Sequence, residues 1–274
     1  LFSFILSASF LVVSFLSPLV SGVADYTGSK KKFLRFFCYL GALSCMTLYL
    51  FDANRIELGM LSVFLASIGY WNSLVFYNAF LPEIAEPEDH DRISARGFTM
   101  GYLGAMLLLI VCLGMIMSTT VGAEKMQYMR YAFILVGLWW IGFSQITYRA
   151  LPNNVYNKTP EKGYIWKGFK ELLLVFKEFK KTKRLKRYLF AFFFFNTGVQ
   201  TVMLMATIFA NKEIAWPEGS GSSGLIIAIL LIQILGALGA FIMSRVSSKI
   251  GNIRTLFISV SIWIVICLGA FFIK

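Results

Sequence analysis

Long apolar segments separated by short polar stretches make up most of the chain. Each segment is about 20 residues long, and at a rise of about 1.5 Å per residue a helix of that length crosses a hydrocarbon core of about 30 Å. Strands of a membrane barrel would instead alternate apolar and polar residues over about ten positions. The pattern therefore predicts eight transmembrane helices, at residues 1–23, 33–51, 58–81, 97–117, 131–150, 188–210, 224–243 and 256–273.

Composition points to the same fold class. Hydrophobic residues make up 58% of the 274 residues and charged residues only 15%, whereas a soluble domain has about a quarter charged residues. In lipid every backbone N–H and C=O group must be paired within the protein, and a helix achieves this within one segment. We therefore expect an all-α integral membrane protein.

The basic residues indicate how the helices are oriented. Of the 26 Lys and Arg residues, 21 lie in the alternate polar stretches 24–35, 82–96, 149–187 and 244–255. Basic residues near helix ends stay on the cytoplasmic side, so these stretches are predicted to be cytoplasmic and both ends of the chain external. The net charge of +12 is thus explained by orientation beside the lipid bilayer, and no nucleic-acid partner is expected.

One long polar stretch divides the chain into three predicted parts. Residues 1–150 form an N-terminal half with five transmembrane helices, residues 151–187 a cytoplasmic linker, and residues 188–274 a C-terminal half with three. Within the linker, apolar residues recur at helical spacing and lysines occupy the other face, which predicts an amphipathic helix in the headgroup plane. It is either a linker resting on the membrane, which we favour, or a regulatory site for lipid or a partner. The apolar residues are Ile165, Trp166, Phe169, Leu172, Leu173, Phe176 and Phe179.

Two polar stretches far apart in the chain resemble each other. When residues 21–33 are aligned with residues 244–256, Gly28 matches Gly251 and Ser21 matches Ser244. Glycine permits a tight reversal with positive φ. The repeat predicts two similar helical halves, an organisation that many transporters share.

The first of these stretches resembles the major facilitator signature between helices two and three of that superfamily. Ala24, Asp25, Gly28 and Lys30 match the signature, whereas the first glycine, the leucine and both arginines are replaced, by Ser21, Val23, Tyr26 and Ser29. Together with residues 77–85, 91–98, 101–104 and 198–202, the chain is similar to the bacterial branch of the family that includes the autophagy-related vacuolar amino-acid effluxers of fungi.

This resemblance implies a major-facilitator-type bundle of two helical repeats in the bacterial cytoplasmic membrane. The eight helices would correspond to helices two to nine of twelve. The chain starts inside an apolar segment without a methionine, so we expect a fragment that lacks the first helix and the last three. The implied function is secondary transport of amino acids or similar small metabolites by alternating access, including amino-acid efflux.

The resemblance also implies roles for particular residues. Helices four and seven of the family would line a central cavity, so Asn196, Gln200, Trp71 and Asn78 are predicted to bind substrate. An alternative is that these amides hydrogen-bond neighbouring helices. Asp25, Gly28 and Lys30 are predicted to form a conformational latch that holds the two halves together.

Two other functions are weaker candidates. A membrane-embedded enzyme needs a buried base, a metal ligand or a nucleophile with its base. The single histidine, His90, lies in an acidic polar stretch, and the four cysteines lie inside apolar segments without metal-ligand spacing. We therefore expect no enzyme activity, cofactor or metal. A receptor or scaffold with the same fold stays open, because fold does not determine function.

Overall fold

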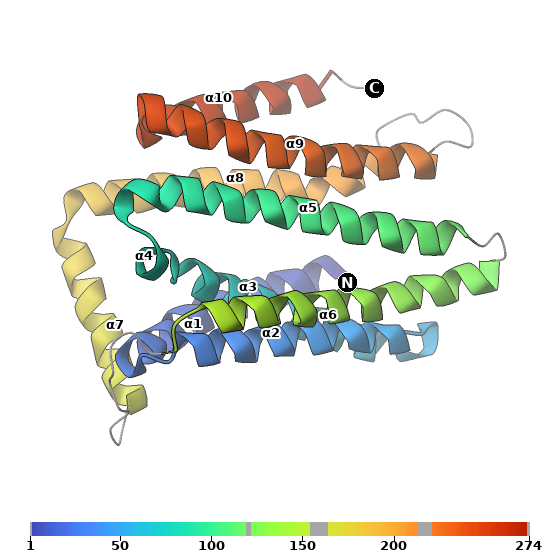
Figure 1. Ribbon diagram of the computed structural model, residues 1–274, viewed down its shortest axis with the longest axis horizontal. Helices are drawn as coiled ribbons and strands as arrows, with labels where there is room; N and C mark the ends of the chain where they lie inside the picture. The colour runs from blue at the N-terminus through green and yellow to red at the C-terminus, as the bar shows by residue number, and fades with distance from the viewer. Residues whose placement is uncertain (1, 119–121, 154–163, 213–220, 273–274) are drawn as a thin grey trace. The chain divides into compact units, whose positions relative to one another are not determined.

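The computed structural model describes residues 2–118, 122–153, 164–212 and 221–272, and these residues are helical apart from short turns (Figure 1). Within these described ranges, eight helices are long and apolar enough to cross a membrane, which confirms the predicted number. They are α1 (Phe2–Thr27), α2 (Lys30–Thr47), α3 (Ile56–Asn78), α5 (His90–Met117), α6 (Gly122–Ala150), α8 (Lys183–Lys212), α9 (Gly221–Ile250) and α10 (Asn252–Ala270).

Shorter elements complete the described chain. The four-residue helix α4 (Leu81–Ile84) and three single 3-10 turns, η1 (Leu48–Leu50), η2 (Ala53–Arg55) and η3 (Pro87–Asp89), lie between the long helices. Helix α7 (Tyr164–Lys181) is the predicted amphipathic helix. Residues 154–163 of the predicted linker lie outside the described residues.

The helices extend further at their basic ends than the apolar pattern predicts. The expected polar stretch 24–35 shrinks to Gly28 and Ser29, and the stretch 244–255 shrinks to Gly251. A helix continues into the headgroup region because its backbone hydrogen bonds are independent of the surrounding solvent, while charged side chains reach water by extending outward. Hydropathy therefore marks the hydrocarbon-spanning part of each helix and misses its ends.

The chain forms two compact units, one of residues 1–87 with 108–176 and the other of residues 88–107 with 177–274. In the first unit α3 packs against α1 and α2, and α2 packs against α6. Phe76 of α3 stacks against Phe33 and Phe37 of α2, with ring centroids 5.6 and 6.0 Å apart. A Cβ on Gly69 would lie 2.4 Å from the Gly41 nitrogen, so glycine lets α2 and α3 approach closely, as in other membrane helix pairs.

In the second unit the first part of α5 packs against α9. The Tyr102 ring lies where a Cβ on Gly236 would be, 2.8 Å away, and the Thr99 hydroxyl lies 3.5 Å from the Ala237 carbonyl oxygen. Helix α10 packs against α9. Many large apolar side chains in both units stay exposed, among them Phe4 at 79% and Leu235 at 64%, which is the surface that a hydrocarbon environment requires.

Candidate functional site

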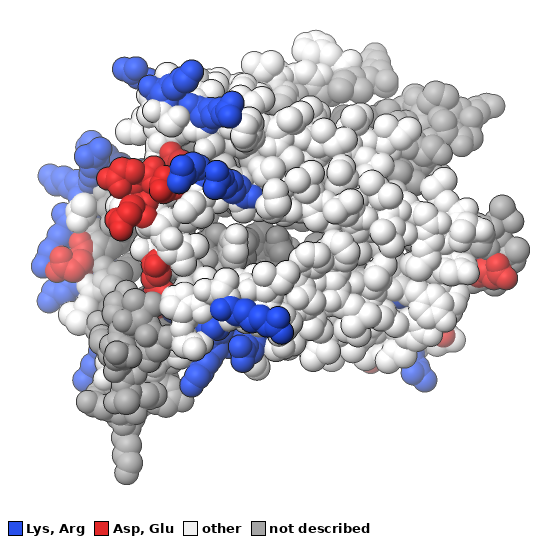
Figure 2. Space-filling view, in the orientation of Figure 1, with Lys and Arg blue, Asp and Glu red and all other residues white. Residues whose placement is uncertain are grey.

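Charged side chains gather at one end of the helices in each unit. Basic residues lie where α1 meets α2 in one unit and where α9 meets α10 in the other, and Figure 2 shows few charges over the middle of the helices. This distribution follows from the cost of an ionisable group in hydrocarbon. The two glycine turns lie at these basic ends, so the candidate site is described there.

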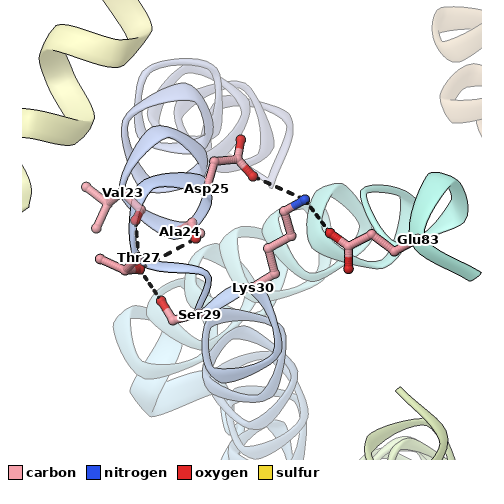
Figure 3. A network of polar contacts seen from close by, with 7 residues as sticks. All are labelled: Val23, Ala24, Asp25, Thr27, Ser29, Lys30 and Glu83. Carbon is pink, nitrogen blue, oxygen red and sulfur yellow. Dashed lines mark hydrogen bonds and ion pairs between the residues drawn. The ribbon is translucent and has the colours of Figure 1, made fainter. Parts of the chain in front are cut away.

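The first turn, residues 23–30 and called here the Gly28 turn, has a left-handed glycine. Gly28 has φ +63°, a conformation that costs other L-residues about 1–2 kcal/mol. The reversal is closed by a hydrogen bond from the Ser29 amide to the Ala24 carbonyl, 3.0 Å long. The Thr27 hydroxyl donates to the Val23 carbonyl at 2.8 Å and contacts the Ser29 hydroxyl at 2.5 Å (Figure 3). The backbone thus places Lys30 at the first position of α2.

Lys30 joins three helices through two ion pairs. Its Nζ lies 2.7 Å from Glu83 Oε1 on α4, which follows α3, and 3.3 Å from Asp25 Oδ1 on α1 (Figure 3). The side chains of Lys30 and Glu83 are 14% and 8% exposed, whereas that of Asp25 is 57% exposed. The buried pair is therefore Lys30–Glu83, and Asp25 is its outer partner.

One atom of this network has no partner among the described residues. Glu83 Oε2 is buried and accepts no hydrogen bond there. Within the described part of the chain, the carboxylate therefore pairs with Lys30 through Oε1 alone. The network thus connects α1, α2 and α4 in the first unit.

A second basic residue of α2 fastens α6 in the same unit. Lys31 Nζ donates to the Leu151 carbonyl oxygen and to Asn153 Oδ1, both at 2.7 Å. The Arg35 guanidinium lies 5.0 Å from the centre of the Tyr148 ring, a cation–π contact. The basic residues at the start of α2 thus connect helices as well as indicating orientation.

The second turn, residues 244–255 and called here the Gly251 turn, is held by a different polar contact. Gly251 has φ +86° and ψ +155°, and its amide donates to the Ser247 carbonyl at 2.8 Å. The Ser247 hydroxyl lies 2.8 Å from Asp91 Oδ2 at the start of α5 and 2.5 Å from Asn252 Oδ1. The Ser244 hydroxyl also lies 3.4 Å from the Asp91 carbonyl oxygen. The carboxylate comes here from the neighbouring helix.

The predicted site residues fall into three groups in the structure. The latch residues Asp25, Gly28 and Lys30 come together in one turn, as described. Trp71 packs on the Phe10 ring with centroids 5.6 Å apart, and Asn78 is exposed at the last position of α3. Asn196 and Gln200 lie one turn apart on α8, both half-buried, in the other unit.

Sequence reasoning did not assign Glu83 or Asn72. Asn72 is fully buried, accepts a hydrogen bond from the Ser17 hydroxyl at 2.8 Å and donates to the Ile68 carbonyl at 2.9 Å. It therefore joins α1 to α3 as a structural amide. A signal for Glu83 existed, since an acid directly after an apolar helix must find a cation or water.

A cavity of about 160 Å³ lies between α2, α3 and α6. Its walls include Tyr70, Ser73, Trp140, Ser144 and Tyr148, and its lining contains no charged side chain. The Tyr148 hydroxyl is buried and has no hydrogen-bond partner among the described residues. These groups offer rings and hydroxyls without formal charge, so the cavity does not complement the ammonium and carboxylate of an amino acid.

The chain matches the family described as Vacuole effluxer Atg22 like over residues 1–272. It belongs to this family. The chain is 26% identical to the uncharacterised MFS-type transporter YxiO of Bacillus subtilis (strain 168), covering 98% of the chain and 62% of that protein. It is 26% identical to autophagy-related protein 22 of Coccidioides immitis (strain RS), covering 88% and 49%. No solved structure matches.

These findings confirm the predicted family and fold class. With eight candidate spans and relatives of the MFS type, the chain is an all-α integral membrane protein of the major facilitator type. It spans between about half and two thirds of the length of these relatives. The alignment of residues 21–33 with residues 244–256 places Gly28 and Gly251 at the same position.

Proposed function

We propose that this protein is a secondary transporter that moves amino acids or similar small metabolites across the bacterial cytoplasmic membrane by alternating access. Family membership supports transport, because the family is described as a vacuole effluxer. Amino acids are the cargo that the family resemblance implies. In this proposal two halves of the protein rock against each other during transport. The halves are residues 1–150 and 188–274, and residues 151–187 link them.

The observation that carries the proposal is the incompletely paired ion network at the Gly28 turn. A transporter of this kind must close its central cavity on one side of the membrane at a time. The contacts that close it must be strong enough to keep the two halves together and weak enough to break in each cycle. Lys30 is shared between Asp25 and Glu83, and Glu83 Oε2 is buried without a partner among the described residues. Asp25 is largely exposed, so its carboxylate is available to a helix end of the other half when the cytoplasmic side closes.

The Gly251 turn supplies the corresponding contact in the second unit. Ser247 holds Asp91 at the start of α5, a helix that belongs by sequence to the first half. A hydrogen bond to a charged group contributes a net stabilisation of about 1.5–3 kcal/mol. Since such a bond can exchange with water, this contact is well suited to open once in each transport cycle.

Substrate binding is assigned to Asn196 and Gln200 of α8, with Trp71 and Asn78 of α3. Amides can bind both the ammonium and the carboxylate of an amino acid, because they donate and accept hydrogen bonds. No Asp, Glu, Lys or Arg occurs in the sequence between Tyr188 and Ala210 or between Leu58 and Asn78, so these two segments offer no obvious proton carrier. Transport through them is then facilitated or weakly coupled.

Efflux and uptake of labelled amino acids by bacterial cells with and without the intact gene test this function. The proposal expects a difference in flux, and it expects Asn196→Ala with Gln200→Ala to lower transport while the amount of protein in the membrane stays unchanged. Equal flux of every labelled amino acid, with the protein abundant in the membrane, would overturn transport of this cargo and favour a receptor or scaffold.

A further inference from the structure

The junction of α7 and α8 has the highest density of positive charge in the chain. Between Lys177 and Arg187 there are seven Lys or Arg residues in eleven positions, with Glu178 as the one acid. The side chains in this segment are exposed apart from Phe179. Glu178 pairs with Lys181 at 3.0 Å, and the seven basic residues against one acid give the segment a net charge of +6.

The geometry of the junction directs this charge along the membrane surface. Helix α7 ends at Lys181 and α8 begins at Lys183, so a single residue, Thr182, separates the two helices (Figure 1). Because α8 is long and apolar enough to cross the membrane, an amphipathic helix that ends one residue before its basic end lies at the level of the headgroups.

The faces of α7 fit that position. Phe169, Leu173 and Phe176 are spaced four and three residues apart, so they share one face, and they are 40%, 51% and 52% exposed. Three lysines spaced seven and four residues apart form a row beside this face. They are Lys170, Lys177 and Lys181, all exposed. Apolar groups and ammonium groups therefore meet at the boundary between acyl chains and headgroups.

We propose that residues 169–187, the basic segment, form a binding surface for anionic phospholipids of the cytoplasmic leaflet. The apolar face of α7 inserts among the upper acyl chains, and the lysine row together with the cations at the start of α8 binds phosphate groups. A lipid surface fits better than an acidic protein, because the apolar row and the lysine row lie side by side along one helix that adjoins a membrane span. The proposal is independent of transport.

The test measures how deeply α7 inserts in vesicles of defined composition. The purified protein, with its four native cysteines replaced by alanine, carries a nitroxide label on Leu173→Cys and is reconstituted into phosphatidylcholine with or without phosphatidylglycerol. Collision of the label with oxygen and with a water-soluble nickel chelate gives its depth. We expect a label below the phosphate level in the anionic vesicles and a shallower one in phosphatidylcholine alone.

Charge variants separate lipid binding from simple apolar insertion. Lys170→Gln with Lys177→Gln and Lys181→Gln should make docking in anionic vesicles about 100-fold less favourable, at roughly fivefold for each lysine. The matched control Arg55→Gln with Lys125→Gln and Arg130→Gln removes the same charge far from α7 and should leave the depth unchanged. Equal depth with and without phosphatidylglycerol would overturn the proposal. Protection of the label from these collisions only in intact cells would also overturn the proposal, because it would assign the apolar face of α7 to a protein partner.

Discussion

The Gly28 turn joins α1 to α2 and the Gly251 turn joins α9 to α10, and a glycine with positive φ lies in both. The first is fastened by the Lys30 cation between two carboxylates, and the second by the Ser247 hydroxyl on one carboxylate. Position 253 of the second turn, which corresponds to Lys30, is an exposed isoleucine. The two repeats thus keep the same reversal of the chain while one carries a buried ion pair and the other a neutral hydrogen-bond donor.

The largest difference in stability between the two turns is expected when the residues at the aligned positions 30 and 253 are exchanged. Lys30→Ile leaves the Glu83 carboxylate buried without its cation, and breaking a buried pair in this way costs about 3–5 kcal/mol. Thermal unfolding of the detergent-solubilised protein should show a large loss of stability. Ile253→Lys, at a residue that is 66% exposed, should change stability little. Adding Glu83→Gln should restore part of the stability, and Lys30→Ile as stable as the parent would show that the ion pair is unimportant.

The two glycines should differ in what they tolerate. Gly251, with φ +86° and ψ +155°, lies in a region that is essentially restricted to glycine, where another residue costs about 1–3 kcal/mol. Gly28, with φ +63°, has a φ that asparagine adopts readily. In the same unfolding assay, Gly251→Asn is expected to be clearly less stable than the parent and Gly28→Asn only slightly so. The reverse order would contradict this account of the turns.

A smaller effect is expected at the hydroxyl that holds α5. Ser247→Ala removes the hydrogen bond to Asp91 and should cost about 1–2 kcal/mol, since the acceptor is charged but partly solvated. The neighbouring Ser248 donates only to the Arg245 carbonyl on its own helix, so Ser248→Ala is the control and should cost a few tenths. If the two variants unfold at the same temperature, the contact between α5 and α9 depends on packing alone.

The smallest effect concerns the hydroxyl pair in the Gly28 turn. Thr27→Val removes the contact with Ser29 and the bond to the Val23 carbonyl, and because Thr27 is buried we expect a loss of about 1 kcal/mol. Thr197 makes the same type of bond, to Phe193, but is exposed, so Thr197→Val should be neutral. Hydrogen exchange of the Ser29 amide, which should rise only in the first variant, gives a local measurement.

The number and order of the membrane helices could be predicted from the sequence because the length of an apolar segment and the thickness of a bilayer are directly comparable. The glycines of both turns were also predictable, since the repeat places them at the same position. The helix ends could not be predicted in this way. Lys30 and His90 are polar residues that begin helices, and hydropathy carries no information about backbone hydrogen bonding.

The partners within the site could not be read from the sequence. Lys30 and Glu83 are 53 residues apart, and Asp91 and Ser247 are 156 residues apart. Each contact depends on which helices become neighbours, and this is decided by packing such as that between Gly41 and Gly69. The sequence therefore predicted Asp25 as the main carboxylate of the latch, whereas the structure buries the Glu83 carboxylate against Lys30 and leaves that of Asp25 mostly exposed.

The brevity of the connection between α1 and α2 has a mechanical consequence. Only Gly28 and Ser29 separate these helices, and a link of two residues leaves little freedom for one helix to swing without the other. A helix of 26 residues is about 39 Å long at 1.5 Å per residue. A tilt of α1 that starts at this hairpin therefore displaces the other end of the helix, on the far side of the bilayer. A fluorophore placed near Phe4 would then report the breaking of the Lys30–Glu83 salt bridge at the hairpin.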